Sequence, residues 1–251
     1  MKRTRALSAC ALLAVLATAC GGGEAAKTRE AKAPRGEAVP GESTTRLTVP
    51  AVETAAAPAV DRTGAPRVLF LGTSLTAGYG LDDPARDAYP AVLQRLADSA
   101  KVPMLIVNAG LSGETSAGAL RRVAWLLKEK PAAVVIETGA NDGLRGLNPD
   151  STAANLKAII GQIRSIAPQA KIALVQMEAP TNLGQRYTRD FHALYGRVAK
   201  AEQVSLFPFL LDKVAGIPTL NQNDGIHPTP AGAKIAAANI WPSVRALVVS
   251  K

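Results

Sequence analysis

Three residues of this chain have the types and the order that nucleophilic catalysis by serine requires. Ser74 stands early in the folded-looking part of the chain, and Asp224 and His227 stand three residues apart near its end. A serine hydroxyl is a poor nucleophile until a base accepts its proton, and an imidazole beside a carboxylate is a common base. The other histidine, His192, lies in a helical pattern, whereas His227 lies in a loop rich in Gly, Asn, Asp and Pro. The pattern predicts a serine hydrolase with His227 as its base.

Attack on a carbonyl also needs N–H groups that stabilise the negative charge on its oxygen. Gly113 follows the apolar run 104–107 and offers a backbone N–H with no side chain in front of it. Asn141 follows the apolar run 132–136 and can donate through its side-chain amide. Glycine and asparagine are common in turns, so either segment alone reads as ordinary loop chemistry. Their order with the serine, the acid and the histidine favours an oxyanion hole.

These segments follow predicted strands, at the edge where open α/β sheets bind their ligands. Apolar runs alternate with helical patterns along the chain, which predicts a parallel sheet with helices on both faces. We therefore expect a five-stranded, three-layer α/β/α domain of the flavodoxin-like type. The expected strands are 68–71, 104–108, 133–137, 171–177 and 204–207, and the expected helices are 89–99, 116–130, 149–166, 186–201 and 230–248.

The segments around these residues resemble the conserved blocks of the GDSL or SGNH hydrolases. Residues 139–146 and 224–228 are similar to the thioesterase I and arylesterase branch of bacterial esterases, and the resemblance covers residues 66–249. It implies hydrolysis of carboxylic esters or thioesters through an acyl-serine intermediate, on lysophospholipid, aryl-ester or acyl-thioester substrates. One residue departs from the family: Thr73 stands where an aspartate usually precedes the serine, which concerns the geometry of the loop more than the reaction.

The resemblance also implies a role for each residue. In it, Ser74 is the nucleophile, His227 is the base and Asp224 orients the base, while the N–H of Ser74, Gly113 and Asn141 form the oxyanion hole. Asn182 and Tyr187 follow the fourth predicted strand and are candidate substrate-binding residues, although their segment reads equally well as a structural loop.

Two other functions use the same residues or the same location. An acyltransferase would share every catalytic group and pass the acyl chain to an alcohol instead of water. A non-catalytic, lipid-binding lipoprotein would have lost the reaction, with Thr73 as a sign of decay, but the intact Ser74, Asn141, Asp224 and His227 argue against it. Residues 72–76 read G-x-S-x-T rather than G-x-S-x-G, which disfavours an ordinary α/β-hydrolase nucleophile elbow.

The amino terminus has the pattern of an export signal. Lys2, Arg3 and Arg5 precede the small and apolar run 6–19, which is too short to span a bilayer as a mature helix. The run closes on Cys20, so we expect residues 1–19 to be a lipoprotein-type signal peptide and Cys20 to be lipidated; a plain secretory signal is the alternative. Residues 20–65 have the composition of a disordered tether, and residues 66–251 are the expected catalytic domain. The expected location is the envelope of a bacterium, in the periplasm or at the cell surface.

Charge and composition limit the partners. The only two cysteines, Cys10 and Cys20, lie in the signal region, and two distant histidines cannot build a metal cluster, so we expect neither metal nor cofactor. Removal of the three signal-region charges lowers the formal net charge from +9 to 9 − 3 = +6. This mild basic balance would attract anionic lipid headgroups or acidic polymers, but no basic cluster after the tether is denser than Arg121-Arg122. An evenly solvated surface is the favoured interpretation. We expect a monomer that acts on a small-molecule or lipid ester, binds the membrane through its anchor, and binds no nucleic acid.

Overall fold

The catalytic domain is built on one parallel sheet of five strands. A computed structural model describes residues 62–249, so the predicted signal, Cys20 and most of the tether lie outside the described residues. The strand order is β2-β1-β3-β4-β5, and every neighbouring pair is parallel. This is the strand order of flavodoxin-like sheets, and it confirms the predicted fold class. The strands are β1 (Arg67–Gly72), β2 (Leu105–Gly110), β3 (Ala133–Glu137), β4 (Lys171–Val175) and β5 (Ser205–Phe207).

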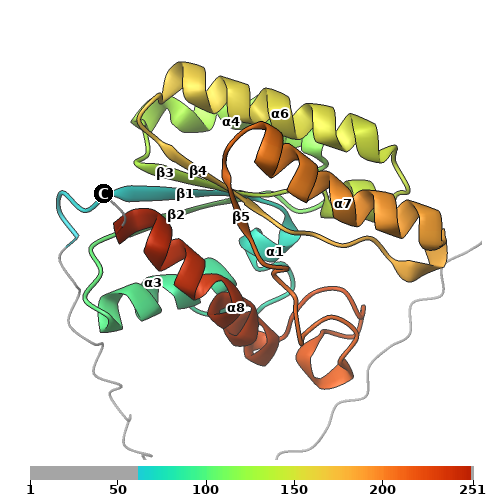
Figure 1. The fold of residues 1–251 in the computed structure, drawn as a ribbon. Coiled ribbons are helices and arrows are strands. Elements are labelled where there is room, and N and C mark those ends of the chain that lie inside the picture. Colours follow the sequence, from blue (N-terminus) through green and yellow to red (C-terminus); the bar gives the residue numbers. More distant parts are fainter. Residues whose placement is uncertain (1–61, 250–251) are drawn as a thin grey trace, which may run out of the picture. The chain divides into compact units, whose positions relative to one another are not determined.

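Helices cover both faces of the sheet. One face is covered by α4, α6 and α7, and the other by α3 and α8 (Figure 1). The long helices are α3 (Tyr89–Ser99), α4 (Ser116–Leu126), α6 (Pro149–Ile166), α7 (Gln185–Ala201) and α8 (Pro230–Val249). The short ones are α1 (Ser74–Ala77), α2 (Pro84–Asp87) and α5 (Ala140–Leu144), with the 3₁₀ turns η1 (Leu127–Glu129), η2 (Thr181–Leu183) and η3 (Pro218–Leu220).

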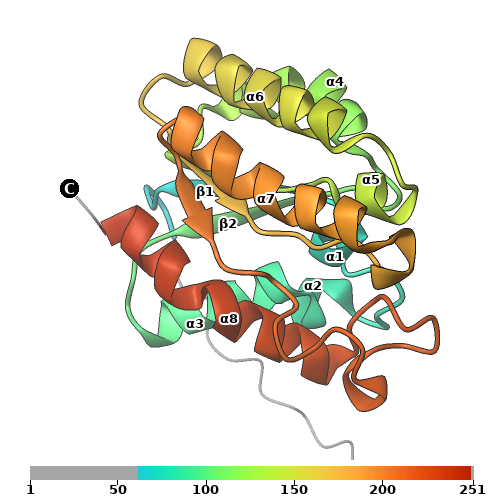
Figure 2. The ribbon, with the colours of Figure 1, turned by 45° about the vertical axis from the view of Figure 1, so that its right-hand side comes forward.

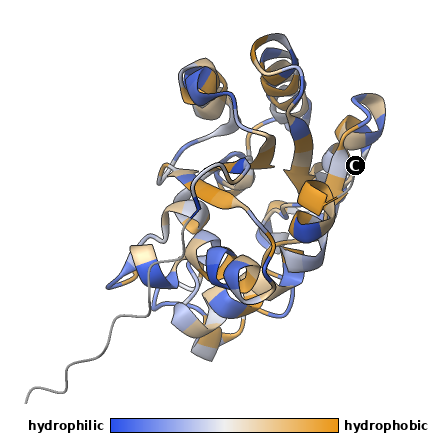
Figure 3. Ribbon diagram, turned by 90° about the vertical axis from the view of Figure 1, so that its left-hand side faces the viewer, coloured by the Kyte–Doolittle hydropathy of each residue, from blue (hydrophilic) through white to orange (hydrophobic). Residues whose placement is uncertain are grey.

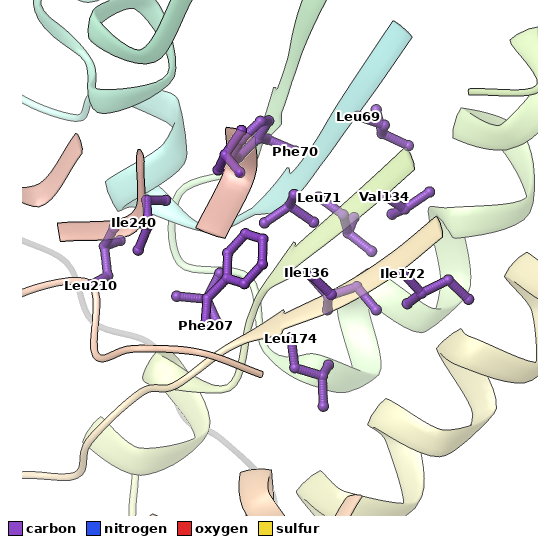
Figure 4. Packing of buried hydrophobic residues seen from close by; sticks show 14 of the residues in the cluster. Leu69, Phe70, Leu71, Val134, Ile136, Ile172, Leu174, Phe207, Leu210 and Ile240 are labelled. Atoms are coloured by element: carbon purple, nitrogen blue, oxygen red, sulfur yellow. The ribbon is translucent and has the colours of Figure 1, made fainter. Parts of the chain in front are cut away.

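The core lies on both faces of the sheet because the strands alternate their side chains between two helical layers. Leu69 and Leu71 of β1, with their neighbours Val134 and Ile136 of β3, point to one helical layer, whereas Phe70 points to the other (Figure 4). The burial of β3 is complete from Ala133 to Glu137. A sheet buried on both faces produces the continuous apolar runs from which the strands were predicted.

The predicted boundaries agree closely with the observed ones, and the differences have local causes. The predicted helix 116–130 ends as an α-helix at Leu126 and continues as the 3₁₀ turn η1, because Lys130 adopts a left-handed conformation with φ 44°. The predicted strand 171–177 ends at Val175, where Gln176 turns its side chain to backbone carbonyls. The short helices α1, α2 and α5 were not predicted, since four or five residues carry no periodic signal.

The carboxyl ends of the strands bring together segments that are far apart in sequence. The connections that follow β1 and β3 begin with α1 and α5, which lie on the same side of the molecule (Figure 2). The loop that precedes α8 pairs with itself through an antiparallel bridge between Asn221 and Pro228. That bridge closes the turn that carries Asp224 and His227.

Candidate active site

Ser74 is the first residue of α1, immediately after β1. Parallel pairing of β1 with both β2 and β3 fixes the end of the strand at Gly72, and the chain turns at Thr73 into the helix. The Ser74 side chain is nearly buried, at 9% exposure, yet its hydroxyl reaches the loop before α8. The predicted position of Ser74, on the turn that leaves a central strand, is therefore where the structure places it.

The structure brings Asp224, His227 and Ser74 into one hydrogen-bonded chain. His227 Nε2 lies 2.8 Å from Ser74 Oγ, and His227 Nδ1 lies 2.6 Å from Asp224 Oδ2. With the carboxylate beside Nδ1, that nitrogen carries the proton and donates it, so Nε2 is left as an acceptor for the serine hydroxyl. The ring of Tyr79 packs against the His227 ring at a centroid distance of 4.8 Å. The imidazole is thus held from two sides.

Asp224 also organises its own turn. Its Oδ1 accepts hydrogen bonds from the backbone N–H groups of Ile226 at 2.9 Å and His227 at 3.0 Å. Desolvation alone would raise the pKa of the Asp224 carboxyl, but the hydrogen bonds from His227 and Ile226 outweigh it and lower the pKa to about 2. The Asp224 carboxyl is therefore ionised at neutral pH.

Hydrogen bonds join α5, which carries Asn141, to the loop that carries Gly113. The Asn141 amide donates to the backbone carbonyl of Glu114 at 3.0 Å, and Arg145 donates to the carbonyl of Gly113 at 2.9 Å. The carbonyls of Glu114 and Gly113 therefore accept from the Asn141 amide and the Arg145 guanidinium. Gly113 itself has φ 75°, a left-handed conformation that favours glycine. These contacts link the two segments predicted to supply N–H donors.

An ion pair between Arg122 and the largely buried Glu114 holds the Gly113 loop against the sheet. Arg122 of α4 makes a bidentate contact with Glu114, with Nη2 to Oε2 at 2.7 Å and Nε to Oε1 at 2.7 Å. The same guanidinium donates to the carbonyls of Gly72 at 3.2 Å and Ala109 at 2.8 Å. One side chain therefore ties the ends of β1 and β2 to the loop beside the serine.

A second carboxylate lies beneath the serine turn. Glu137, at the end of β3, is fully buried and accepts hydrogen bonds from the Thr73 N–H at 3.0 Å, the Thr73 hydroxyl at 2.9 Å and the Thr76 hydroxyl at 2.8 Å. Desolvation raises the pKa of Glu137 to about 7, against the opposing effect of these donors. Sequence reasoning missed Glu137, although an acid at the end of an otherwise apolar strand was a signal for it.

A cavity of about 310 Å³ opens beside Ser74. This volume is at the lower end of the range for small-molecule sites. Its walls are mostly apolar, and Glu178 is the one charged residue among those that line it in the described part of the chain. The apolar lining consists of Leu75, Ala140, Leu144, Met177, Ala179, Pro180, Phe209, Leu211, Ala215 and Ile226. Sequence reasoning did not find the contributions from 209–215, because nothing local in an irregular segment tells which way it faces.

Asn182 and Tyr187 are not among the residues that line this cavity. Asn182 is exposed in η2, and the Tyr187 hydroxyl donates to the backbone carbonyl of Leu147 at 2.7 Å. Tyr187 also stacks on Phe191 of the same helix. Tyr187 therefore joins α7 to the segment at Leu147, and residues 177–180 of the preceding segment line the cavity.

The remaining histidine, His192, contacts an acid at the surface of α7. His192 lies in α7 with 63% of its side chain exposed, and its Nδ1 is 2.6 Å from Glu178 Oε1. Among residues 62–249, no group of three His, Cys, Asp or Glu side chains could hold a metal ion. No helix in that same range is long and apolar enough to cross a bilayer.

Comparison with known proteins places this geometry in a family. Residues 70–235 match the model of the GDSL-like Lipase/Acylhydrolase family. The chain is 43% identical over 183 residues to esterase TesA of Pseudomonas aeruginosa, covering 72% of this chain and 89% of that protein. It is 41% identical over 162 residues to thioesterase 1/protease 1/lysophospholipase L1 of Escherichia coli K12, covering 64% of this chain and 74% of that protein.

A solved structure shares the fold at similar coverage. The psychrotrophic esterase EstA from Pseudoalteromonas, in a form inhibited by monoethylphosphonate, matches with a TM-score of 0.67 and 33% sequence identity. The match covers 72% of this chain and 97% of that one.

Proposed function

Because the chain belongs to the GDSL-like lipase/acylhydrolase family, we propose that it hydrolyses carboxylic esters and thioesters with apolar acyl chains through an acyl-serine intermediate. Relatives that are 41 to 43% identical to it over 162 to 183 residues are named as an esterase and as a thioesterase and lysophospholipase, so the reaction class is carboxylic ester hydrolysis. The observation that carries the mechanism is the hydrogen-bonded chain from Asp224 through His227 to Ser74, with its two links of 2.6 and 2.8 Å.

In the first half of the reaction, Ser74 Oγ attacks the ester carbonyl while His227 Nε2 accepts the hydroxyl proton. Asp224 holds the Nδ1 proton and stabilises the imidazolium that forms. The carbonyl oxygen becomes an oxyanion, for which the N–H groups of Ser74 and Gly113 and the amide of Asn141 are the proposed donors. Collapse of this intermediate expels the leaving group, which takes its proton from His227, and leaves the acyl chain on Ser74.

In the second half, a water molecule replaces the alcohol or thiol. His227 accepts a proton from this water as it attacks the acyl-serine, and the same donors stabilise the second oxyanion. Transfer of the proton from His227 back to Ser74 Oγ releases the carboxylic acid and restores the starting state. No cofactor takes part in the proposed sequence.

The cavity beside Ser74 supports an apolar acyl chain as the part of the substrate that is bound. Its large apolar lining residues include Phe209, Leu211, Ile226, Leu144 and Met177. Burial of each methylene in such a site contributes about 0.8 kcal/mol, so the specificity constant should rise with chain length until the cavity is full. A volume of about 310 Å³ favours short to medium chains.

A panel of p-nitrophenyl esters of increasing acyl length tests this proposal. The unsubstituted protein should hydrolyse them with an optimum at short to medium chains, and Ser74→Ala should abolish both turnover and covalent labelling by an organophosphonate. Ser99→Ala, an exposed serine at the end of α3, is the matched control and should keep full activity. Undiminished turnover in Ser74→Ala would refute the serine mechanism.

We further propose that the enzyme works in the cell envelope, held to a membrane by acyl chains on Cys20. The support is the sequence pattern of residues 1–20 alone, a basic start, a short apolar run and a closing cysteine. The apolar run is too short to span a bilayer as a mature helix, so this pattern favours a lipid anchor over a spanning segment.

A further inference from the structure

The fold gathers basic side chains at the edge of the sheet opposite Ser74. We call this group the amino-edge cluster. In a parallel sheet all strands begin at one edge, and the helices that cross back over the sheet end there as well. Cations placed separately at strand starts and helix ends are therefore brought together. The cluster consists of Arg62 and Arg67 before and at the start of β1, Lys101 after α3, Lys128 and Lys130 after α4, and Lys171 at the start of β4.

Three of these cations surround one cavity. Arg67, Lys130 and Lys171 line a hollow of about 460 Å³ at the starts of β1, β3 and β4. The strands are fixed next to each other there, since Ala132 N–H donates to the Arg67 carbonyl at 2.9 Å and Lys171 N–H donates to the Ala132 carbonyl at 3.0 Å. No acidic residue lines this cavity in the described part of the chain.

The same cavity has an apolar side. Leu247 and Val248 from the end of α8 line it together with Pro66 and Pro131. Figure 3 looks onto this edge of the molecule, where hydrophilic and hydrophobic segments lie side by side. The hollow therefore combines positive charge with an apolar surface, and a ligand that fits it carries an anionic group next to an apolar one.

A second cavity continues the first. It has a volume of about 500 Å³ and is lined by Arg62 and Lys101 with the apolar Val102 and Met104, and Pro66 lines both cavities. Asp98 also lines it and pairs with Arg62 at 2.5 Å. Both hollows therefore combine basic and apolar lining residues, and Pro66 is common to them.

The cluster keeps a net positive charge. One of its six cations, Arg62, is paired with Asp98, and Glu129 lies next in sequence to Lys128 and Lys130. Within residues 62–249, Arg67, Lys101, Lys128 and Lys130 form no ion pair. The catalytic cavity differs in sign, because its one charged lining residue is Glu178.

We propose that the amino-edge cluster is a docking surface for membranes that contain anionic phospholipids. The phosphate groups would contact the arginine and lysine side chains, and the apolar side of the cavities would contact the adjoining glycerol and acyl atoms. Each cation near an anionic membrane strengthens binding by about fivefold. The segment that carries Cys20 joins the domain at Arg62, on this same edge, so an acyl anchor and the cluster would bind one membrane together. Ser74 lies at the opposite edge of the sheet and stays accessible.

Vesicle sedimentation of the full chain carrying Cys20→Ser tests the proposal without an acyl anchor. The protein should bind vesicles in which phosphatidylglycerol replaces a third of the phosphatidylcholine, and should leave pure phosphatidylcholine vesicles in solution. Binding should weaken as salt is added, because exposed charges are screened. Removal of two cluster charges by Arg67→Gln with Lys130→Gln should lower the partition coefficient roughly twentyfold.

The matched control removes the same charge from another surface. Arg121→Gln with Lys157→Gln takes two exposed cations from α4 and α6 and should keep most of the binding. Both double variants should hydrolyse a soluble p-nitrophenyl ester at the unsubstituted rate, which shows that they fold. Three results would overturn the proposal: equal loss in the control variant, equal binding to both kinds of vesicle, or binding of inorganic phosphate at the cluster without binding of vesicles. The esterase proposal is tested separately by the turnover of that ester.

Discussion

Thr73 donates both its backbone N–H and its hydroxyl to Glu137, a carboxylate that is completely buried below the serine turn. These two hydrogen bonds give Thr73, which stands where the family usually has aspartate, a defined structural role. Together with the Thr76 hydroxyl, it surrounds the Glu137 carboxylate with donors and ties the turn that presents Ser74 to the end of β3. The departure from the family pattern at Thr73 is therefore compatible with an ordered catalytic turn.

Glu137 should make the stability of the domain depend on pH. The pKa of Glu137 is about 7 in the folded protein, compared with 4.5 for an unperturbed glutamate. Between pH 4.5 and pH 7, Glu137 is therefore protonated in the folded state and ionised in the unfolded state. The free energy of unfolding should fall as pH rises through this window, by up to about 3 kcal/mol. Glu137→Gln should remove this fall. Urea unfolding at several pH values measures it, and an unchanged slope in the variant would contradict the assignment.

Asp224 should orient His227 rather than merely close its turn. Asp224→Asn can present an N–H to Nδ1 and so favour the wrong tautomer, and kcat should drop by up to about 10⁴ while the fold is kept. Circular dichroism checks the fold and ester turnover checks the rate. His192→Gln, which alters the histidine that contacts Glu178, is the control and should keep its activity. A folded Asp224→Asn protein with most of its activity would leave a dyad of Ser74 and His227.

Asn141 should act in the transition state more than in substrate binding. Asn141→Ala removes one proposed oxyanion donor, so kcat should fall by about 10² to 10³ with a much smaller change in KM. Asn148→Ala is a useful comparison, because Asn148 accepts from the Asp150 N–H as the cap of α6. That variant should lose about 1 kcal/mol of stability and no catalytic rate. If the Asn141 variant changes KM alone, Asn141 binds substrate and does not stabilise the oxyanion.

The buried pair of Arg122 and Glu114 should be sensitive to the loss of either partner. Arg122→Met leaves the Glu114 carboxylate, only 5% exposed, without its cation, and should destabilise the domain by about 3 to 5 kcal/mol. Replacement of both residues at once, Arg122→Met with Glu114→Gln, should recover part of that loss. Thermal unfolding of the single and double variants gives the comparison. Additive losses in the double variant would show that the two side chains act independently.

Cys20 should decide whether the protein stays with membranes under conditions that weaken charge contacts. After a wash at high ionic strength, the unsubstituted protein should remain in the membrane fraction and Cys20→Ser should be released. The wash separates acyl anchoring from the charge-dependent docking proposed above. A processed Cys20→Ser protein that resists the wash would exclude lipidation as the anchor.

Local patterns in the sequence determined the fold class and most of the helix boundaries. The apolar runs of β1 and β3 are visible because a sheet covered on both faces buries every residue of its central strands. The start of α6 at Pro149 is also visible in the sequence, because Asn148 is a typical helix cap and proline is favoured at the first helical position. The serine, the acid and the histidine were also found in the sequence, because the type and order of their blocks are informative without distances.

Contacts between distant segments were decided only by the tertiary structure. The cavity wall at Phe209 and Leu211, the placement of Asn182 and Tyr187 outside that cavity, and the burial of Glu137 each depend on how separate loops pack at one edge of the sheet. The distribution of surface charge also depends on the tertiary structure. The sequence has no dense basic cluster, but the parallel strands and the returning helices bring scattered cations to one edge of the sheet. Spacing along a chain does not report such proximity, because each of these contacts joins residues whose local sequences are independent of one another.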